Sequence, residues 1–147
     1  MDDTDRRLLE ALLADARTSW ADLGRLVGLS APAAQERVRK LERDGVLRGT
    51  TARVAPAAVG LGVSALVGLQ QREGVEADAI TLALSAVPEI EDCWFVAGDE
   101  AVLVKVRVAD LEDLDRTLRV LRHIPGVSRT RTTVVLNTPF EGRARVP

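Results

Sequence analysis

The sequence predicts an α+β protein of two domains, an N-terminal winged helix-turn-helix followed by a ferredoxin-like βαββαβ domain. In residues 1–54 leucines recur at helical spacing, and a glycine turn separates two of the predicted helices. In residues 63–137 the order strand–helix–strand–strand–helix–strand is that of a split βαβ unit. Residues 55–62, small and punctuated by proline and glycine, form the predicted linker, and residues 138–147 form a C-terminal tail.

The first domain is predicted to begin with a helix over about residues 4–14, which carries leucines on one side. Ser19 can cap a second helix, and Asp22 three residues later completes an approximate capping box. Gly28 can adopt the positive φ that ends this helix and opens a turn. These signals together predict a first helix followed by the first half of a helix-turn-helix.

A third helix is predicted to start after Ser30, its N-cap, with Pro32 in the first turn, where a missing N–H costs little. The pair Asp44-Gly45 ends this helix, and residues 46–54 are predicted to form a short hairpin or wing. The apolar residues of the second and third helices are spaced to form one small core, namely Leu23, Leu26, Leu29, Ala34, Val38 and Leu41.

The outer face of the third helix has the composition of a helix that reads a DNA duplex. Short side chains allow close approach, an amide pairs with base edges, and cations bind phosphates. Capped, leucine-rich helix pairs also occur as ordinary helical hairpins, and Glu36 on this face weakens contact with phosphates. The predicted DNA-contacting residues are Ser30, Ala31, Ala33, Gln35, Arg37, Arg39 and Lys40.

The charge distribution indicates that one copy of the chain binds DNA weakly. The net charge is −2, and residues 1–60 contain only a slight excess of Lys and Arg over Asp and Glu. Because DNA affinity rises with the number of phosphates that a protein neutralises, function on double-stranded DNA implies a dimer or larger assembly.

The second domain alternates between strand and helix periodicity. The predicted strands cover 63–69, 90–97, 102–108 and 127–136, and the predicted helices cover 75–85 and the segment that follows the cap Asp110. Gly98-Asp99 is predicted to form a tight hairpin turn between the second and third strands. The inward-facing helix residues are predicted to be Ala79, Ile80, Ala83 and Leu84 in the first helix, and Leu111, Leu114, Leu118 and Leu121 in the second.

Both helices are expected to cover the same face of the sheet, since each has one apolar stripe. The other face is predicted to carry Leu66, Gly68, Leu103, Val134 and Leu136 among serines and threonines. A half-apolar open face in a domain of this size favours a partner subunit, and an isologous dimer is the simplest arrangement.

The composition excludes several classes of protein. No window approaches the roughly 18 consecutive apolar residues of a membrane span, and the acidic start predicts neither a signal peptide nor a transit peptide. A single cysteine excludes an internal disulfide framework and fits a reducing cytoplasm. Phosphate-binding loops, dinucleotide fingerprints and metal-ligand spacings are missing, so we expect no enzymatic activity, no cofactor and no metal site.

The order of motifs resembles the Lrp/AsnC family of transcription regulators over essentially the whole chain. The first domain carries Asp5-Arg6-Arg7-Leu8-Leu9, Leu29-Ser30, Arg37-Val38-Arg39-Lys40-Leu41-Glu42 and Gly45-Val46-Leu47. The second carries Val96-Ala97-Gly98-Asp99 and Ile124-Pro125-Gly126-Val127. Each motif is loose by itself, whereas the set in this order and at this spacing is specific.

The resemblance implies dimers built through the C-terminal sheet, often assembled into tetramers or octamers, with a small effector, usually an amino acid, bound between dimers. The positions that match this pocket are Gly98, Asp99, Glu100, Ala101, Thr130 and Thr132. Many members carry an acidic residue where this chain has Ala101, so Asp99 or Glu100 is expected to bind the ammonium group of the effector instead.

The sequence therefore predicts a cytoplasmic, homo-oligomeric DNA-binding regulator of amino-acid or related metabolism that responds to a small effector. Two alternatives remain open at this point. One is an architectural oligomer that bends or wraps DNA without an effector, and the other is an amino-acid sensor that acts on a protein partner.

Overall fold

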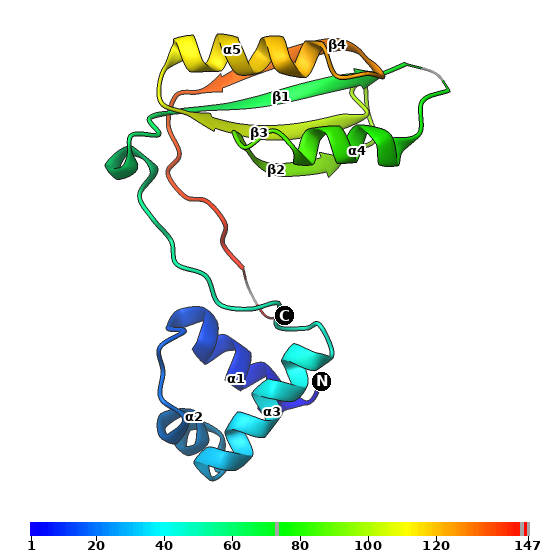
Figure 1. Cartoon of the computed structure of the whole chain (residues 1–147). Coiled ribbons are helices and arrows are strands. Elements are labelled where there is room, and N and C mark those ends of the chain that lie inside the picture. The colour runs from blue at the N-terminus through cyan, green and yellow to red at the C-terminus, as the bar shows by residue number, and fades with distance from the viewer. Residues whose placement is uncertain (73, 145, 147) are drawn as a thin grey trace. The chain divides into compact units, whose positions relative to one another are not determined.

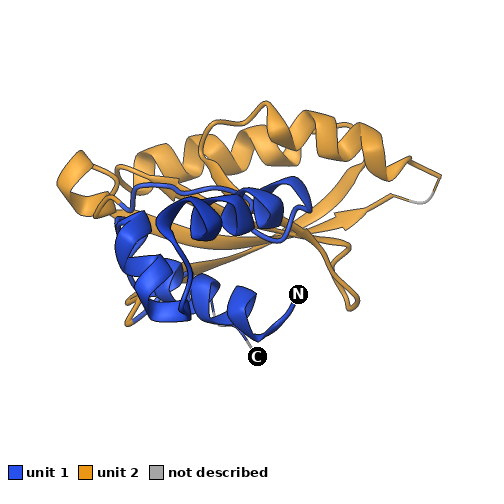
Figure 2. Cartoon of the chain, turned by 90° about the horizontal axis from the view of Figure 1, so that it is seen from below, with its two compact units in different colours: residues 1–53, 140–147 blue, residues 54–139 orange. Residues whose placement is uncertain are grey.

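The structure is a computed structural model that describes residues 1–72, 74–144 and 146 (Figure 1). The chain divides into two compact units, residues 1–53 with 140–147 and residues 54–139 (Figure 2). The last residues of the chain belong to the unit that contains the N-terminus, which the sequence did not indicate.

The first unit contains three helices, α1 (Asp3–Ala14), α2 (Trp20–Val27) and α3 (Ala31–Arg43). Helix α1 begins with a complete capping box in which the side chains of Asp2 and Asp5 each accept from the backbone N–H of the other. The centre of the bundle is formed by the buried residues Leu8, Leu23, Ala34 and Val38. The three-helix arrangement predicted from leucine spacing is thereby confirmed.

The turn between α2 and α3 has the predicted geometry. Gly28 adopts the left-handed conformation, with φ at 73°, and the Ser30 hydroxyl accepts from the N–H of Ala33 at 3.4 Å. Ser19 caps α2 by accepting from the N–H of Asp22. The carboxylate of Asp22 accepts from the Ser19 hydroxyl at 2.5 Å, so the predicted capping box is only half formed.

Two expectations about this unit are wrong. The segment predicted as a hairpin or wing, residues 46–54, contains no strand and runs as irregular backbone. Leu26 is 44% exposed rather than buried, because α2 turns Leu23 and Gly24 toward the core. Gly24 occupies the inner position in its place and is buried. A glycine there brings α2 close to the backbone of the turn.

The second unit is a four-stranded sheet with two helices. Its elements are the 3-10 helix η1 (Pro56–Val59), β1 (Val63–Gln71), α4 (Ala77–Ser85), β2 (Ile90–Phe95), β3 (Val102–Val108), α5 (Leu111–Arg122) and β4 (Val127–Val135). The strand order is β2-β3-β1-β4, and neighbouring strands are antiparallel. The predicted βαββαβ fold is therefore confirmed.

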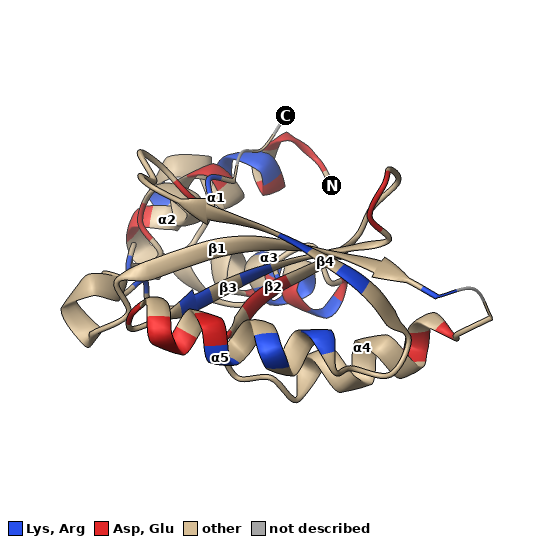
Figure 3. Ribbon diagram, turned by 90° about the horizontal axis from the view of Figure 1, so that it is seen from above, with Lys and Arg blue, Asp and Glu red and all other residues tan. Residues whose placement is uncertain are grey.

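Both helices lie on the same side of the sheet, as Figures 1 and 3 show together. The core between the layers contains the alternating residues of β1 and β3 and the inner residues of the helices, such as Val67, Val104, Ile80 and Leu121. Two helix residues predicted to face inward do not. Leu111, the first residue of α5, is 65% exposed, and Ala79 is exposed although the next residue of α4, Ile80, is buried in the core.

The face assignment of β4 is also different from the prediction. Val134 pairs with Ala65 and Thr132 with Val67, so these β4 residues share the helix-covered face with core residues of β1. Leu136 lies beyond the strand and is 96% exposed. A β-bulge between Gln70 and Gln71 shifts the register at the start of the pairing, and a one-residue shift moves every following side chain to the opposite face.

Candidate nucleic-acid interface and ligand pocket

The outer face of α3 presents the residues expected to contact DNA. Ala33, Arg39 and Lys40 are exposed, whereas Ala31 and Gln35 are half-buried. The Ser30 hydroxyl is engaged in the cap, where it accepts from the N–H of Ala33. Arg39 and Lys40, for which the described residues provide no ion-pair partner, lie further along the helix than the short side chains of its first turn, where the backbone can approach a phosphate.

Glu36 does not act as an isolated negative charge on this face. Its carboxylate accepts from Arg43 at 2.8 Å, and this hydrogen bond lowers the pKa of Glu36 below its usual range. The pair is exposed on both sides, so it contributes little to stability. Its consequence is electrostatic, because Arg43 compensates a carboxylate that would repel phosphates.

Arg37 is placed differently from the other predicted DNA contacts. Its guanidinium donates to Asp2 at 2.6 Å and to Asp5 at 2.8 Å, which are the two capping residues of α1. The hydrogen bond from Arg37 lowers the pKa of Asp2, and the same contacts raise the pKa of Arg37. Arg37 therefore joins α3 to the start of α1, and its charge is directed away from the outer face.

A polar pocket of about 270 Å³ opens on the sheet face that the helices leave uncovered. It is lined by Gly68, Gln70, Asp99, Glu100, Arg129, Thr130 and Arg131. Asp99 and Glu100 come from the connection between β2 and β3, which spans residues 96–101 and is longer than the predicted tight turn. Hydrogen bonds from Val96 N–H to the Ala101 carbonyl and from Ala101 N–H to the Leu69 carbonyl hold this connection against β1.

The floor of the pocket is made by the close approach of Glu100 to Gly68. A β-carbon added at residue 68 would lie 2.4 Å from Cγ of Glu100, so only glycine leaves room for this side chain on the sheet. Arg131 pairs directly with Gly68 across the strands, and its guanidinium lies 3.7 Å from the Glu100 carboxylate. The Glu100 carboxylate and the Arg131 guanidinium thus lie together over Gly68, where β1 has no side chain.

The predicted pocket residues are only partly brought together. Asp99, Glu100 and Thr130 line this pocket, while Gly98 and Ala101 line an adjoining hollow of about 420 Å³. The side chain of Thr132 lies on the helix-covered face, as does the Thr130 hydroxyl, which accepts from Arg122 at 3.3 Å. The residues that the sequence reasoning missed are Gly68, Gln70, Arg129 and Arg131. Had the sequence shown which β4 residues lie on the uncovered face, it would have identified Arg129 and Arg131.

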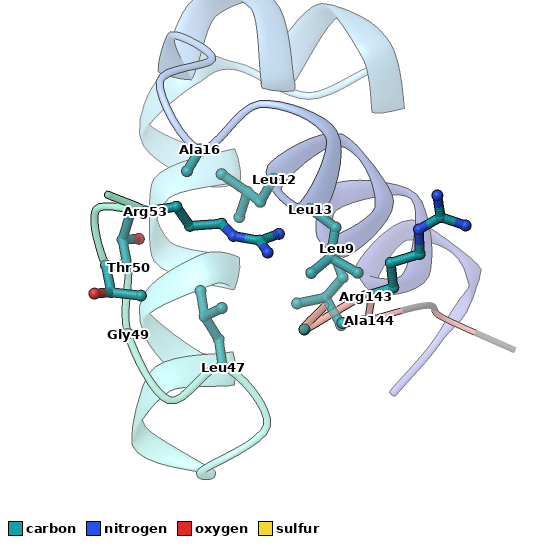
Figure 4. Close-up of a pocket in the computed structure, with 12 residues that line it drawn as sticks. Leu9, Leu12, Leu13, Ala16, Leu47, Gly49, Thr50, Arg53, Arg143 and Ala144 are labelled. Atoms are coloured by element: carbon teal, nitrogen blue, oxygen red, sulfur yellow. The ribbon is translucent and has the colours of Figure 1, made fainter. Parts of the chain in front are cut away.

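A second hollow, of about 410 Å³, lies inside the first unit (Figure 4). The apolar side chains around it come mainly from α1 and the segment after α3, namely Leu9, Leu12, Leu13, Ala16 and Leu47. Arg53 crosses it and donates to the backbone carbonyl of Glu141 at 2.5 Å, beside Gly142 and Arg143 of the tail. This hollow is where the C-terminal segment rests on the helical unit.

Other kinds of site are not evident in the part of the chain that the structure describes. No group of three or more His, Cys, Asp or Glu side chains converges there as a metal ion would require. Over the same residues, every helix is too short or too polar to cross a bilayer.

Comparison with known proteins identifies the family. The AsnC-type helix-turn-helix model matches residues 1–42, and the Lrp/AsnC ligand binding domain matches residues 63–145. The HTH-type transcriptional regulator LrpA of Mycobacterium tuberculosis is 40% identical over 100% of this chain and 97% of its own length. The leucine-responsive regulatory protein of Escherichia coli is 35% identical over 92% of this chain and 85% of its own length.

Solved structures agree with the sequence comparison. The crystal structure of the leucine response regulatory protein LrpA of M. tuberculosis superimposes with a TM-score of 0.90 at 39% identity, covering 100% of both chains. A feast or famine regulatory protein of M. tuberculosis in complex with L-methionine superimposes with a TM-score of 0.93 at 40% identity and 99% coverage of both chains. The chain therefore belongs to the Lrp/AsnC family of helix-turn-helix transcription regulators.

Proposed function

We propose that this regulator binds an α-amino acid in the pocket at Asp99 and Glu100 and that this binding controls how a homo-oligomer engages DNA. The observation that carries the proposal is the meeting of carboxylates and guanidiniums over Gly68 in one pocket. An α-amino acid brings an ammonium and a carboxylate, and such a pocket supplies an ionic partner for each. The L-methionine complex of the related M. tuberculosis protein supports the same class of ligand.

The DNA-binding part of the proposal rests on α3. Gln35 reads a base edge, and Arg39 and Lys40 bind phosphates, while Ser30, Ala31 and Ala33 let the helix approach the backbone. Arg37 acts from within the unit by holding α3 to α1.

The oligomer forms through the uncovered face of the sheet, on which the pocket at Asp99 and Glu100 also opens, so the pocket lies at the edge of the subunit interface. Leu66 and Leu103 are half-buried at its centre, and Trp94 beside Leu103 is 44% exposed. A second copy placed on this face by a twofold axis would remove these side chains from water. Two helix-turn-helix units in one dimer then read half-sites spaced by about one turn of DNA or a multiple of it.

The experiment combines ligand binding with DNA binding on the full chain. Thermal-shift measurements with each of the twenty amino acids should show stabilisation by at least one of them, because a ligand that binds only the folded state raises stability by mass action. That amino acid should change the DNase footprint on the operator, and Asp99→Ala should abolish the thermal shift while leaving DNA binding without ligand intact.

Three results contradict parts of the proposal. If none of the twenty amino acids binds while DNA is bound tightly, the chain is an architectural DNA-binding protein. If no DNA is bound at low salt, the helix-turn-helix does not function on DNA. If Asp99→Ala and Glu100→Ala leave the amino-acid affinity unchanged, the effector binds elsewhere.

A further inference from the structure

The pocket has an unusual composition for a site that would take an aliphatic effector. Of the seven described residues that line it, five have charged or amide side chains, one is glycine, and the hydroxyl of Thr130 lies on the helix-covered face. Burial of an aliphatic side chain contributes about 25 cal/mol per Å² only when the apolar surface is removed from water onto other apolar surface. The lining is predominantly polar, so the side chain of leucine or methionine would be buried mainly against polar groups.

The charges of the pocket form two tiers along β1. The first tier consists of Glu100 and Arg131. Arg131 pairs with Gly68 across the strands, and its guanidinium lies 3.7 Å from the Glu100 carboxylate. The second tier consists of Asp99 and Arg129. Arg129 pairs with Gln70, two residues further along β1, and so lies on the same side of the sheet as Arg131. Two residues of a strand span roughly 6.6–6.8 Å, about the length of a small amino acid.

The second tier can bind the head group of the effector. Asp99 and Arg129 both line the pocket, both are exposed, and neither forms an ion pair within the described residues. The carboxylate of Asp99 matches an ammonium group, and the guanidinium of Arg129 matches a carboxylate in bidentate geometry. The first tier, with Glu100 and Arg131, then faces the side chain of the effector.

We propose that the effector of this chain has an uncharged side chain that both donates and accepts hydrogen bonds, such as a carboxamide. This inference rests on the proposed function, since it describes the ligand of the same pocket. Glu100 accepts from the side-chain donor and Arg131 donates to the side-chain acceptor. A side-chain carboxylate would meet Glu100 and a side-chain ammonium would meet Arg131, so each charged side chain is repelled by one member of the pair.

An aliphatic side chain is disfavoured for a different reason. It would displace water from Glu100 and Arg131 without replacing the hydrogen bonds that the water makes, which leaves polar groups desolvated. Glu100 is the more affected of the two, because its side chain is 24% exposed whereas that of Arg131 is 76% exposed. Selection therefore depends on the polar groups of the first tier rather than on pocket size.

The test uses amino acids of equal shape. Asparagine, leucine and aspartate have nearly the same outline and differ in the side-chain end group, as do glutamine, methionine and glutamate. Calorimetric titration of the full chain should give an affinity for asparagine or glutamine at least tenfold higher than for the matching aliphatic and acidic amino acids. Arg131→Leu should lower the affinity for the carboxamide at least tenfold and leave that for leucine unchanged or higher, whereas Arg119→Leu on α5 should change neither.

The outcomes separate this inference from the proposed function. If leucine or methionine binds as tightly as its amide counterpart, or if aspartate or glutamate binds more tightly, the inference is wrong and the proposed function stands. If the carboxamide is preferred but Arg131→Leu leaves the preference unchanged, the assignment of the first tier is wrong. If no amino acid binds the full chain, both fail together.

Discussion

Gly24 in α2 and Leu29 in the turn before α3 are in direct backbone contact. The Leu29 N–H donates to the Gly24 carbonyl at 2.8 Å, and a β-carbon added at residue 24 would lie 2.5 Å from the Leu29 carbonyl oxygen. The obstacle is backbone rather than a flexible side chain, so the turn would have to move to make room. The angle at which α3 leaves the turn therefore depends on the absence of a side chain at residue 24.

Gly24→Ala is expected to destabilise the helical unit by about 1–3 kcal/mol, the usual cost of overpacking. Thermal or urea unfolding of the full chain measures this loss. Gly28→Asn is the matched control, because residue 28 has open space around it and asparagine tolerates its left-handed conformation. An unchanged unfolding midpoint for Gly24→Ala would mean that the turn can move to make room for the methyl group without loss of stability.

Replacing Arg37 by glutamine is expected to lower stability, whereas replacing Arg39 by glutamine is expected to lower DNA affinity. Arg37→Gln removes the link to Asp2 and Asp5, so the unfolding temperature should fall, and the fall should shrink at low pH as Asp2, whose pKa the hydrogen bond from Arg37 lowers, becomes protonated. Arg39→Gln should leave the unfolding temperature unchanged and weaken DNA binding with a smaller salt dependence. Fluorescence anisotropy at several salt concentrations, beside thermal unfolding, distinguishes the two roles.

Gln35 is expected to contribute sequence specificity. Gln35→Ala should cost about 1–3 kcal/mol on the operator and little on random DNA, because an amide on a base edge discriminates between bases whereas a phosphate contact does not. Parallel titrations with operator and random duplexes measure the difference. Equal losses on the two duplexes would show that Gln35 does not read a base.

The uncovered sheet face is expected to hold the dimer together. Leu66→Arg places a cation next to Lys105, its partner across the strands, in the centre of this face and should convert dimers to monomers at micromolar concentration. Light scattering on the full chain gives the mass. Leu82→Arg, at a 74% exposed position on α4, should leave the dimer intact, and a dimeric mass for Leu66→Arg would place the interface elsewhere.

Glu91 is expected to make the second unit sensitive to acid. Figure 3 shows the acidic positions of β2 beside the basic positions of β3. Although burial alone raises its pKa, hydrogen bonds from Lys105 and Arg107 hold the pKa of Glu91 below its usual range. A carboxylate with a lowered pKa in the folded state contributes stability above its ordinary pKa of about 4.3 and loses it as the pH falls through the lowered value.

Glu91→Gln should therefore reduce the stability at pH 7 and make it depend less steeply on pH in the acid range. Urea unfolding between pH 7 and pH 3 measures both effects. Glu112→Gln serves as the control, since the Glu112 side chain is 87% exposed and lies 3.8 Å from its ion-pair partner. If the free energy of unfolding depends on pH identically in the two variants, the contacts of Glu91 with Lys105 and Arg107 do not stabilise the fold.

The local features of the fold could be predicted from the sequence because each depends on residues within four positions of one another. The caps at Ser19, Ser30 and Asp110 and the left-handed Gly28 lie at the predicted positions. The alternation of β1 and β3 and the leucines of α5 identified the sheet core and the helix that covers it. The order of these elements was enough to predict the fold class and the family.

Three features depended on tertiary structure, because each joins residues that are distant in sequence. A bulge between Gln70 and Gln71 sets the face of the β4 side chains, so alternation within β4 alone placed Val134 on the uncovered face, whereas Arg131 lies there. Arg37 is directed to Asp2 and Asp5 by the packing of α3 on α1.

The ligand pocket shows most clearly what only the tertiary structure decided. Asp99 and Glu100 could be recognised from their place in the chain, but nothing local indicates that Glu100 lies on Gly68 or that Arg131 lies opposite. Sequence patterns report backbone preference and burial, which are local averages over a few residues. A binding site is defined by the distances between side chains on different strands, and these follow from the register of the sheet.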